Sequence, residues 1–291
     1  MKARVTKILS KNYWVNIDGN NYLATPRGAI KQFCKILVGD IVEVDYNDYA
    51  GVYVINKVYP RINELKRPPV ANLEQLVIVI ALVPAPDFEL VDKLLIFAMQ
   101  QNIKPIFVVN KCDLATSDKV MEIINAYKFC TEHIIAVSAL TRDNLQSLVK
   151  LLRGKLSAFA GQSAVGKSTL INALTNKELA PTQELSAKLN RGKHTTRHTE
   201  IYSIDDILIA DTAGFSMLEL KDIKYDNLHT YYPEFASSDK CAYSGCTHVN
   251  CSSKDCAIVE DVESGVINTG RYERYVKLYN ALKGNWRNRY D

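Results

Sequence analysis

The sequence of 291 residues contains no apolar run that approaches the roughly 20 residues a helix needs to span a bilayer. Its first residues, MKARVTKILSKNYW, alternate between polar and apolar types and lack the apolar block of a secretory signal peptide. Internal repeats and low-complexity tracts are absent as well. We therefore expect a cytoplasmic protein with no membrane partner, and we take it to be a monomer.

The composition is that of an ordinary globular protein. Apolar residues make up 47% and charged residues 23%, and 36 basic against 32 acidic side chains leave a net charge of +4. This mild excess identifies no partner. The length allows two or three domains, and changes of pattern place them at residues 1–65, 66–220 and 221–291.

Two different strand patterns support this division. Residues 1–60 read as about five short strands separated by turns, which predicts a small β-barrel, an OB-fold above all. From residue 75, buried-strand runs such as QLVIVIALV alternate with amphipathic segments such as FELVDKLLIFAMQQN. That alternation predicts a parallel α/β sheet with right-handed crossovers. The segment RINELKRPPVAN between the two patterns reads as a linker.

A phosphate-binding loop follows the predicted strand KLSAFAG and opens the predicted helix KSTLINALT. Its sequence, GQSAVGKS, matches G-x-x-x-x-G-K-[ST], in which glycines let backbone N–H groups turn toward the α- and β-phosphates. We expect Lys167 to reach the β- and γ-phosphates as a catalytic group and Ser168 to bind Mg²⁺. The nucleotide-binding residues of this loop are Gly161, Gln162, Ser163, Ala164, Val165, Gly166, Lys167, Ser168 and Thr169.

A D-x-x-G motif ends the later strand ILIAD. Asp211 suits an indirect partner of Mg²⁺, and the N–H of Gly214 can reach the γ-phosphate. The D-x-x-G motif alone is weak evidence for a nucleotide site, but it is strong evidence when it follows a P-loop.

Guanine selection is predicted by the sequence NKCD, which follows the buried strand KPIFVVN. The carboxylate of Asp113 can accept hydrogen bonds from the guanine N1–H and amino group, donors that adenine lacks. We expect Lys111 to pack along the base and Asn110 to tie loops together, with Cys112 between them. Ser138 and Ala139, after the strand IIAV, fit the companion motif whose backbone contacts the base.

A cluster of thiols near the C-terminus indicates a structural zinc site rather than disulfides, because no secretion signal is present. Cys241, Cys246 and His248 offer three ligands, and Cys256 or Cys251 offers the fourth.

The order of these motifs is unusual, because the base-reading motifs precede the P-loop. With the cysteine cluster, that order resembles the circularly permuted GTPases of small ribosomal subunit biogenesis, over nearly the whole chain. The matching segments are NKCD, SA, GQSAVGKST, RGKHTT, DTAGF and the spacing C-x4-C-x-H. Two departures are Ala213, where the family usually has proline, and the longer interval from His248 to Cys256.

The resemblance implies an OB domain, a GTPase core and a small helical zinc domain, acting on the 30S subunit and its 16S rRNA late in assembly. It favours Cys256 as the fourth ligand of one structural Zn²⁺, because AIVED aligns with the family's helix after the ligand. It also favours Thr196 as a ligand of the Mg²⁺ that accompanies GTP. This threonine ends the segment RGKHTT, which corresponds to the switch I loop of GTPases. Phe215 stands where many GTPases carry a water-orienting glutamine, so His194 is our candidate for that role; the alternative is that His194 contacts RNA or solvent.

Residues 271–291 hold six basic and two acidic side chains with interleaved aromatics. They could contact RNA, as could the barrel, or the aromatics could pack the helix onto its own domain. Two further functions stay open at this stage. One is a nucleic-acid-binding module with GTP as a structural ligand, and the other is a GTP-dependent metal chaperone.

Replacing Asp113 by Asn should weaken GTP binding and admit xanthosine triphosphate, because the 2-oxo group of xanthine suits an amide donor. Competition binding with GTP, XTP and ATP measures this. Equal affinities of the unchanged protein for GTP and XTP would show that Asp113 does not read the base.

Overall fold

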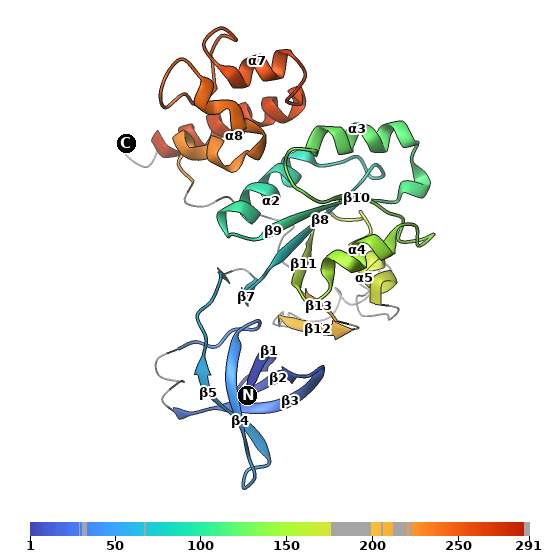
Figure 1. Ribbon diagram of the computed structural model, residues 1–291, viewed down its shortest axis with the longest axis vertical. Coiled ribbons are helices and arrows are strands. Elements are labelled where there is room, and N and C mark those ends of the chain that lie inside the picture. Colours follow the sequence, from blue (N-terminus) through green and yellow to red (C-terminus); the bar gives the residue numbers. More distant parts are fainter. Residues whose placement is uncertain are drawn as a thin grey trace.

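The computed structural model describes residues 1–28, 30, 34–66, 68–175, 199–204, 206–211, 220 and 223–287. Three units follow one another along the chain (Figure 1): a barrel in blue, a sheet with helices in green and yellow, and a helical unit in orange and red. Within the described residues, no helix is both long and apolar enough to cross a membrane.

The first unit is a closed barrel of the OB type. Its strands pair in the order β1–β2–β3–β5–β4, and β4 pairs back with β1. The pairs are antiparallel except β3 with β5, which run parallel. Alternate side chains such as Val5, Val15 and Ile55 fill the interior. The strands are β1 (Lys2–Leu9), β2 (Asn12–Ile17), β3 (Asn20–Pro26), β4 (Ile41–Asn47) and β5 (Val52–Val58).

The segment that we expected to be a plain linker forms a two-stranded hairpin, β6 (Glu64–Lys66) with β7 (Pro69–Ala71). Arg61 fastens it to the barrel, because its Nε and Nη2 donate to the two oxygens of the fully buried Asp40 at 2.6 and 2.7 Å. The side chain of Asn63, before β6, bonds to the backbone N–H and C=O of Leu73, after β7, and so joins the two ends of the hairpin. A bidentate buried pair of this kind constrains the chain far more than a linker would be constrained.

The second unit is a sheet in the order β10–β9–β8–β11–β13–β12, parallel except for β12, which also pairs with β1 of the barrel. Every residue of β8 is buried, as expected for a strand covered on both faces. Helices α2 and α3 pack on one face and α4 and α5 on the other. The strands are β8 (Gln75–Ala81), β9 (Lys104–Asn110), β10 (Ile134–Ala136), β11 (Leu156–Ala160), β12 (Glu200–Ile204) and β13 (Ile207–Asp211). The helices are α2 (Phe88–Gln100), α3 (Ser117–Tyr127), α4 (Leu145–Leu152) and α5 (Lys167–Thr175), with the short η1 (Cys112–Leu114) after β9.

The third unit is helical and shares its core with α2, whose Ile96 is buried among the aromatic side chains of this unit. It lies on the far side of the sheet from the barrel (Figure 1). Its elements are η2 (Tyr225–Tyr231), η3 (Pro233–Lys240), α7 (Ala257–Glu263) and α8 (Thr269–Arg287).

A buried ionic network joins α8 to α2. Arg271 is 1% exposed, and its Nη1 lies 2.6 Å from Asp92 while its Nε pairs with Glu234. Burial disfavours the guanidinium charge, but the carboxylates of Asp92 and Glu234 outweigh it and raise the pKa of Arg271. Arg274 donates to the same Asp92 at 2.5 Å, and the hydroxyl of Tyr127 donates to it at 2.8 Å. The interface therefore depends on a carboxylate that three groups share.

Replacing Asp92 by Ala should loosen the third unit, because it leaves Arg271 buried and partly unpaired, at a cost of about 3–5 kcal/mol. Amide hydrogen exchange of α7 and α8 should accelerate. The matched control is Lys277→Ala, which removes an exposed pair with Glu89 and should cost less than about 1 kcal/mol. Equal exchange in the two variants would contradict this account of the interface.

Candidate nucleotide site and metal cluster

The nucleotide motifs meet at one edge of the sheet. In a parallel sheet the carboxyl ends of the strands lie at the same edge, where open α/β folds bind ligands. NKCD follows β9, the Ser138 motif follows β10, the P-loop follows β11, and β13 ends at Asp211. The permuted motif order therefore leads to one site, because strand position rather than chain order brings the loops together.

Asn110 joins three of these loops. It is 2% exposed, its Nδ2 donates to the carbonyl of Val165 at 2.9 Å, and its Oδ1 accepts from the N–H of Ala139 at 3.1 Å. The P-loop and the base-reading loops are thus held together by a single side-chain amide. Gly166 is required beside it, since φ is +90° and a Cβ would lie 2.5 Å from the Asn110 Nδ2.

Asp113 is oriented by Ser138. The hydroxyl of the fully buried Ser138 donates to Oδ1 of Asp113 at 2.5 Å and accepts from the N–H of Thr141 at 3.1 Å. We expected only the backbone at Ser138 and Ala139 to act, toward the base. In the structure the Ser138 side chain has a further role, which is to hold the carboxylate that would read guanine.

Lys111 lies across the site and contacts the P-loop. Its residue adopts a left-handed conformation with φ 61°, and its Nζ donates to the carbonyls of Val83 and Ala164 at 3.0 and 2.7 Å. Next to it, Cys112 is half-buried, and its Sγ contacts the carbonyl of Val109. The stem of Lys111 is therefore placed to form one wall for a base.

The P-loop opens α5, as expected, so the N-terminus of that helix and the loop N–H groups can receive an anion. Gly161 permits a close approach to β8, because a Cβ there would lie 2.1 Å from the carbonyl oxygen of Val79. The Nζ of Lys167 donates to the carbonyls of Gly161 and Gln162 at 2.8 and 2.6 Å. Burial lowers the pKa of Lys167, an effect that a bound phosphate would reverse. Ser168 follows on the first turn of α5.

The side chain of Gln162 has a role that the sequence did not indicate. Its Oε1 accepts from the N–H of Asp87 at 2.5 Å, and its Nε2 donates to the carbonyl of Ala85 at 2.9 Å. Asp87 in turn caps α2, accepting from the N–H of Leu90. The P-loop is thus linked to the start of the helix that carries the buried network described above. Gln162 occupies a position of the P-loop motif that accepts any residue, so the motif does not predict such a contact.

Of the other predicted site residues, His194, Thr196 and Gly214 lie outside the described residues, as do the side-chain surroundings of Asp211. Their roles stay predictions.

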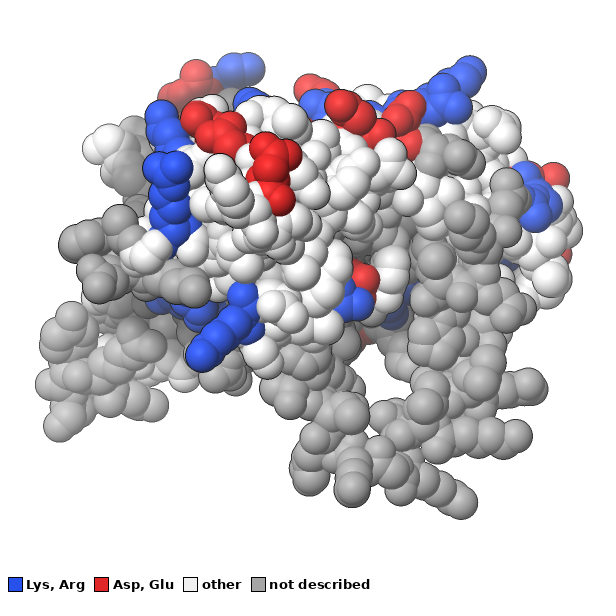
Figure 2. All heavy atoms as spheres, turned by 90° about the horizontal axis from the view of Figure 1, so that it is seen from below, with Lys and Arg blue, Asp and Glu red and all other residues white. Residues whose placement is uncertain are grey.

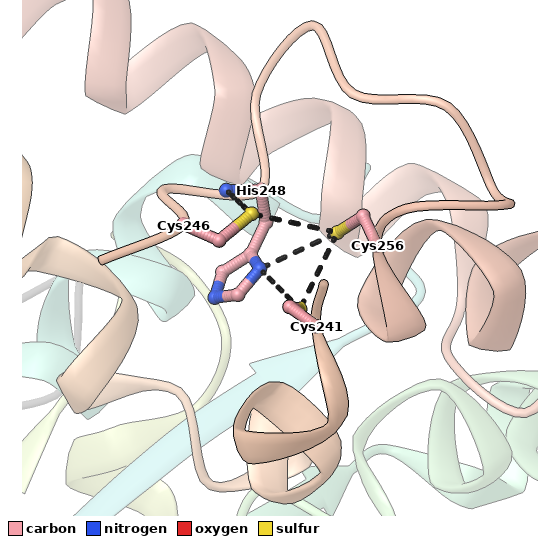
Figure 3. Close-up of side chains that lie close together, drawn as sticks. All are labelled: Cys241, Cys246, His248 and Cys256. Carbon is pink, nitrogen blue, oxygen red and sulfur yellow. Dashed lines mark hydrogen bonds between the residues drawn. The ribbon is translucent and has the colours of Figure 1, made fainter. Parts of the chain in front are cut away.

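The predicted metal ligands converge between η3 and α7 (Figure 3). Ligand atoms of Cys241, Cys246, His248 and Cys256 all lie within 4.8 Å of one another. Cys256 is 3.9 Å from both other thiol sulfurs, and the His248 Nδ1 is 3.4 and 3.6 Å from the sulfurs of Cys256 and Cys241. A tetrahedral ion with bonds of about 2.3 Å to sulfur and 2.0 Å to nitrogen separates its ligands by about 3.5–3.8 Å. The residues fit a closed zinc site.

The protonation of the free ligands agrees with metal binding. Burial, with His229 nearby, lowers the pKa of His248 to about 4, so its imidazole is neutral. Burial raises the pKa of Cys256 to about 12, so a metal would have to displace the thiol proton. Cys251 contacts the sulfur of Cys246 at 3.6 Å and is not among the four clustered ligands.

Two arginines and two tyrosines of α8 serve inside the protein, whereas Lys277 is 69% exposed. Arg271 and Arg274 belong to the network with Asp92, and Tyr275 and Tyr279 are 0% and 5% exposed. This supports the internal-packing alternative over an RNA-facing helix for the residues that the structure describes.

Comparison with known proteins agrees with this geometry. The family described as RsgA GTPase matches residues 58–221. A protein named "Small ribosomal subunit biogenesis GTPase RsgA" from Geobacillus sp. (strain WCH70) is 40% identical over 289 residues, 97% of each chain. The chain belongs to the RsgA GTPase family. Another RsgA, from Caldanaerobacter subterraneus, is 38% identical over 286 residues, covering 94% of this chain and 96% of its own.

Two solved structures of similar proteins share the fold of this RsgA-family chain. YjeQ from Thermotoga maritima is 34% identical with a TM-score of 0.84, covering 97% of this chain and 98% of that one. YloQ, described as a circularly permuted GTPase, is 28% identical with a TM-score of 0.82, covering 98% of this chain and 95% of that one. The predicted permuted GTPase fold is therefore confirmed.

Changing Cys256 to Ser should release one equivalent of metal and unfold the segment between η3 and α7, because a structural site contributes directly to folding. Cys251→Ser is the matched control and should retain the metal. Metal content by mass spectrometry and hydrogen exchange of α7 measure the two effects. Loss of metal from Cys251→Ser with retention in Cys256→Ser would reverse the choice of ligand.

Proposed function

We propose that this protein binds and hydrolyses GTP in the cytoplasm to assist late maturation of the small ribosomal subunit. The observation that carries the proposal is Asn110, which draws the base-reading loops and the P-loop into one site in a chain of the RsgA GTPase family. The names of the relatives supply the small ribosomal subunit as the partner. Within it, 16S rRNA is the expected contact.

Each residue at the sheet edge has a proposed task. Asp113, held by Ser138, reads guanine, and Lys111 covers the base. The P-loop N–H groups and Lys167 hold the phosphates, and Lys167 exchanges its two carbonyl partners for phosphate oxygens. Mg²⁺ would neutralise charge on the β- and γ-phosphates, with Ser168 and Thr196 as its protein ligands.

We assign the orienting of the attacking water to His194. Phe215 cannot do it, and His194 lies in the segment that matches switch I. If the loop that carries His194 is ordered only on the ribosomal subunit, turnover of the free protein is slow, because the apparent rate scales with the fraction in the competent state. Subunit binding then stimulates hydrolysis, and hydrolysis releases the protein.

The two flanking units dock the enzyme in this proposal, with domains at 1–65, 66–220 and 221–291. A single structural Zn²⁺ held by Cys241, Cys246, His248 and Cys256 keeps the third unit folded. That unit is fastened to α2 by the network around Asp92. The closed arrangement of four ligands supports a structural role over metal transfer, because a transfer site needs an accessible position.

The test is single-turnover GTP hydrolysis with and without saturating small subunits, with large subunits as the control. We expect strong stimulation of the unchanged protein by small subunits alone. His194→Ala should keep GTP-dependent subunit binding and lose most of the stimulation, whereas Lys167→Ala should lose hydrolysis in every condition. Full stimulation of His194→Ala would assign water orientation to another group, and an absence of small-subunit stimulation would refute the proposed function.

A further inference from the structure

Two turns of the barrel lie toward the same end of it. Strands β3 and β5 run parallel, with Ala24 opposite Tyr53, so the turns that precede them share one end of the barrel. One turn follows β2 at residues 18–19 and the other joins β4 to β5 at residues 48–51. The second turn projects at the bottom of Figure 1, far from the helical unit.

Four tyrosines form a surface at this end, which we call the tyrosine end: Tyr22, Tyr46, Tyr49 and Tyr53. The ring centroid of Tyr53 lies 5.2 Å from those of Tyr22 and Tyr46, with interplanar angles of 57° and 64°. Tyr53 is half-buried against the barrel core, while Tyr22 and Tyr46 are 41% and 52% exposed. Tyr49 is fully exposed at the tip. Large aromatic surface of this kind is typical of a binding site.

The turn that presents Tyr49 is ordered. The Oδ1 of Asn47 accepts from the N–H groups of Tyr49 and Ala50 at 3.0 and 3.1 Å, and Gly51 closes the turn with φ 66°. The backbone that carries Tyr49 is therefore held in place before any partner arrives, which lowers the entropic cost of binding.

The charged side chains of the two turns and adjoining strand residues at the tyrosine end are all acidic, and the amino group of Met1 lies beside one of them. Residues 16–22 and 45–53 contain three aspartates and no lysine or arginine: Asp18, Asp45 and Asp48. Asp45 is partly compensated by the amino group of Met1 at 3.7 Å and by the side chain of Asn56. Asp18 and Asp48 are exposed on the turns themselves. Figure 2, which views the molecule from below, shows basic and acidic side chains along the same side of the face, with largely uncharged surface between them.

We propose that the tyrosine end binds an arginine-rich peptide segment of a protein partner. Guanidinium groups stack on tyrosine faces and pair with carboxylates in a planar, two-bonded geometry, so aromatic rings beside aspartates suit arginine in particular. RNA is disfavoured at this end, because its phosphates would meet the exposed carboxylates of Asp18 and Asp48. This partner goes beyond the proposed GTPase function and needs no nucleotide.

The test uses the full-length protein and a fluorescent peptide of alternating arginine and glycine, read by anisotropy. Tyr49→Ala combined with Tyr46→Ala should raise the Kd about tenfold, and Asp48→Asn should raise it less and flatten its salt dependence. Tyr49→Phe should bind nearly as well as the unchanged protein, since the ring face remains. Tyr243→Ala is the matched control, because this tyrosine is 68% exposed in the third unit.

The same peptide with citrulline in place of arginine should not bind, because citrulline keeps the shape and loses the charge. Tyr49→Ala alone guards against misfolding of the double variant, since Tyr49 lies fully outside the barrel core. An unchanged Kd in Tyr49→Ala and the double variant would overturn the proposal. So would equal binding of the citrulline peptide, or an oligouridylate or oligoadenylate that binds and depends on Tyr46 and Tyr49. Each measurement omits ribosomes and GTP, so its failure is distinct from failure of the proposed function.

Discussion

The nucleotide site depends on the side-chain amide of Asn110. Because the chain is permuted, no continuous segment runs from the P-loop to the base-reading motifs in the usual order, and the loops must be joined across strands. Asn110 does this with two hydrogen bonds, to Val165 and Ala139. The amide is 2% exposed, so both bonds are protected from competition by water. Gly166 allows the approach, since any side chain there would meet the amide.

Helix α2 connects the nucleotide site to the third unit. Its cap, Asp87, is bound by Gln162 of the P-loop, and one turn further along Asp92 receives Arg271 and Arg274 of α8. The P-loop, which would hold phosphate, thus contacts α2. The third unit, which would hold zinc, contacts the same helix. Its apolar side chains serve two cores, with Leu94 facing the sheet and Ile96 facing the third unit. The second and third units are consequently connected by specific polar contacts as well as by the chain.

Much of this arrangement could be read from local patterns. The P-loop, NKCD and the alternation of strands and helices each have a fixed spacing with a direct physical cause, and their identification as a permuted GTPase is confirmed. The OB-type barrel followed from strand spacing alone. Contacts between distant residues had no such signal. The sequence predicts a linker at residues 61–72, yet Arg61 reaches back to a buried Asp40. It leaves α8 open between an RNA surface and internal packing, and the burial of Arg271 supports packing.

The sequence by itself predicts the chemistry of this protein: a phosphate loop, a carboxylate for guanine and a set of thiols with an imidazole, because each is carried by neighbouring residues at set intervals. Only the tertiary structure decided which groups share a site. It placed Cys256 with Cys241, Cys246 and His248, and Ser138 beneath Asp113. It also turned Arg271 and Arg274 of α8 toward the buried Asp92. Pairings of this kind depend on how elements pack, and an arginine has the same local pattern whether it meets solvent or a buried carboxylate.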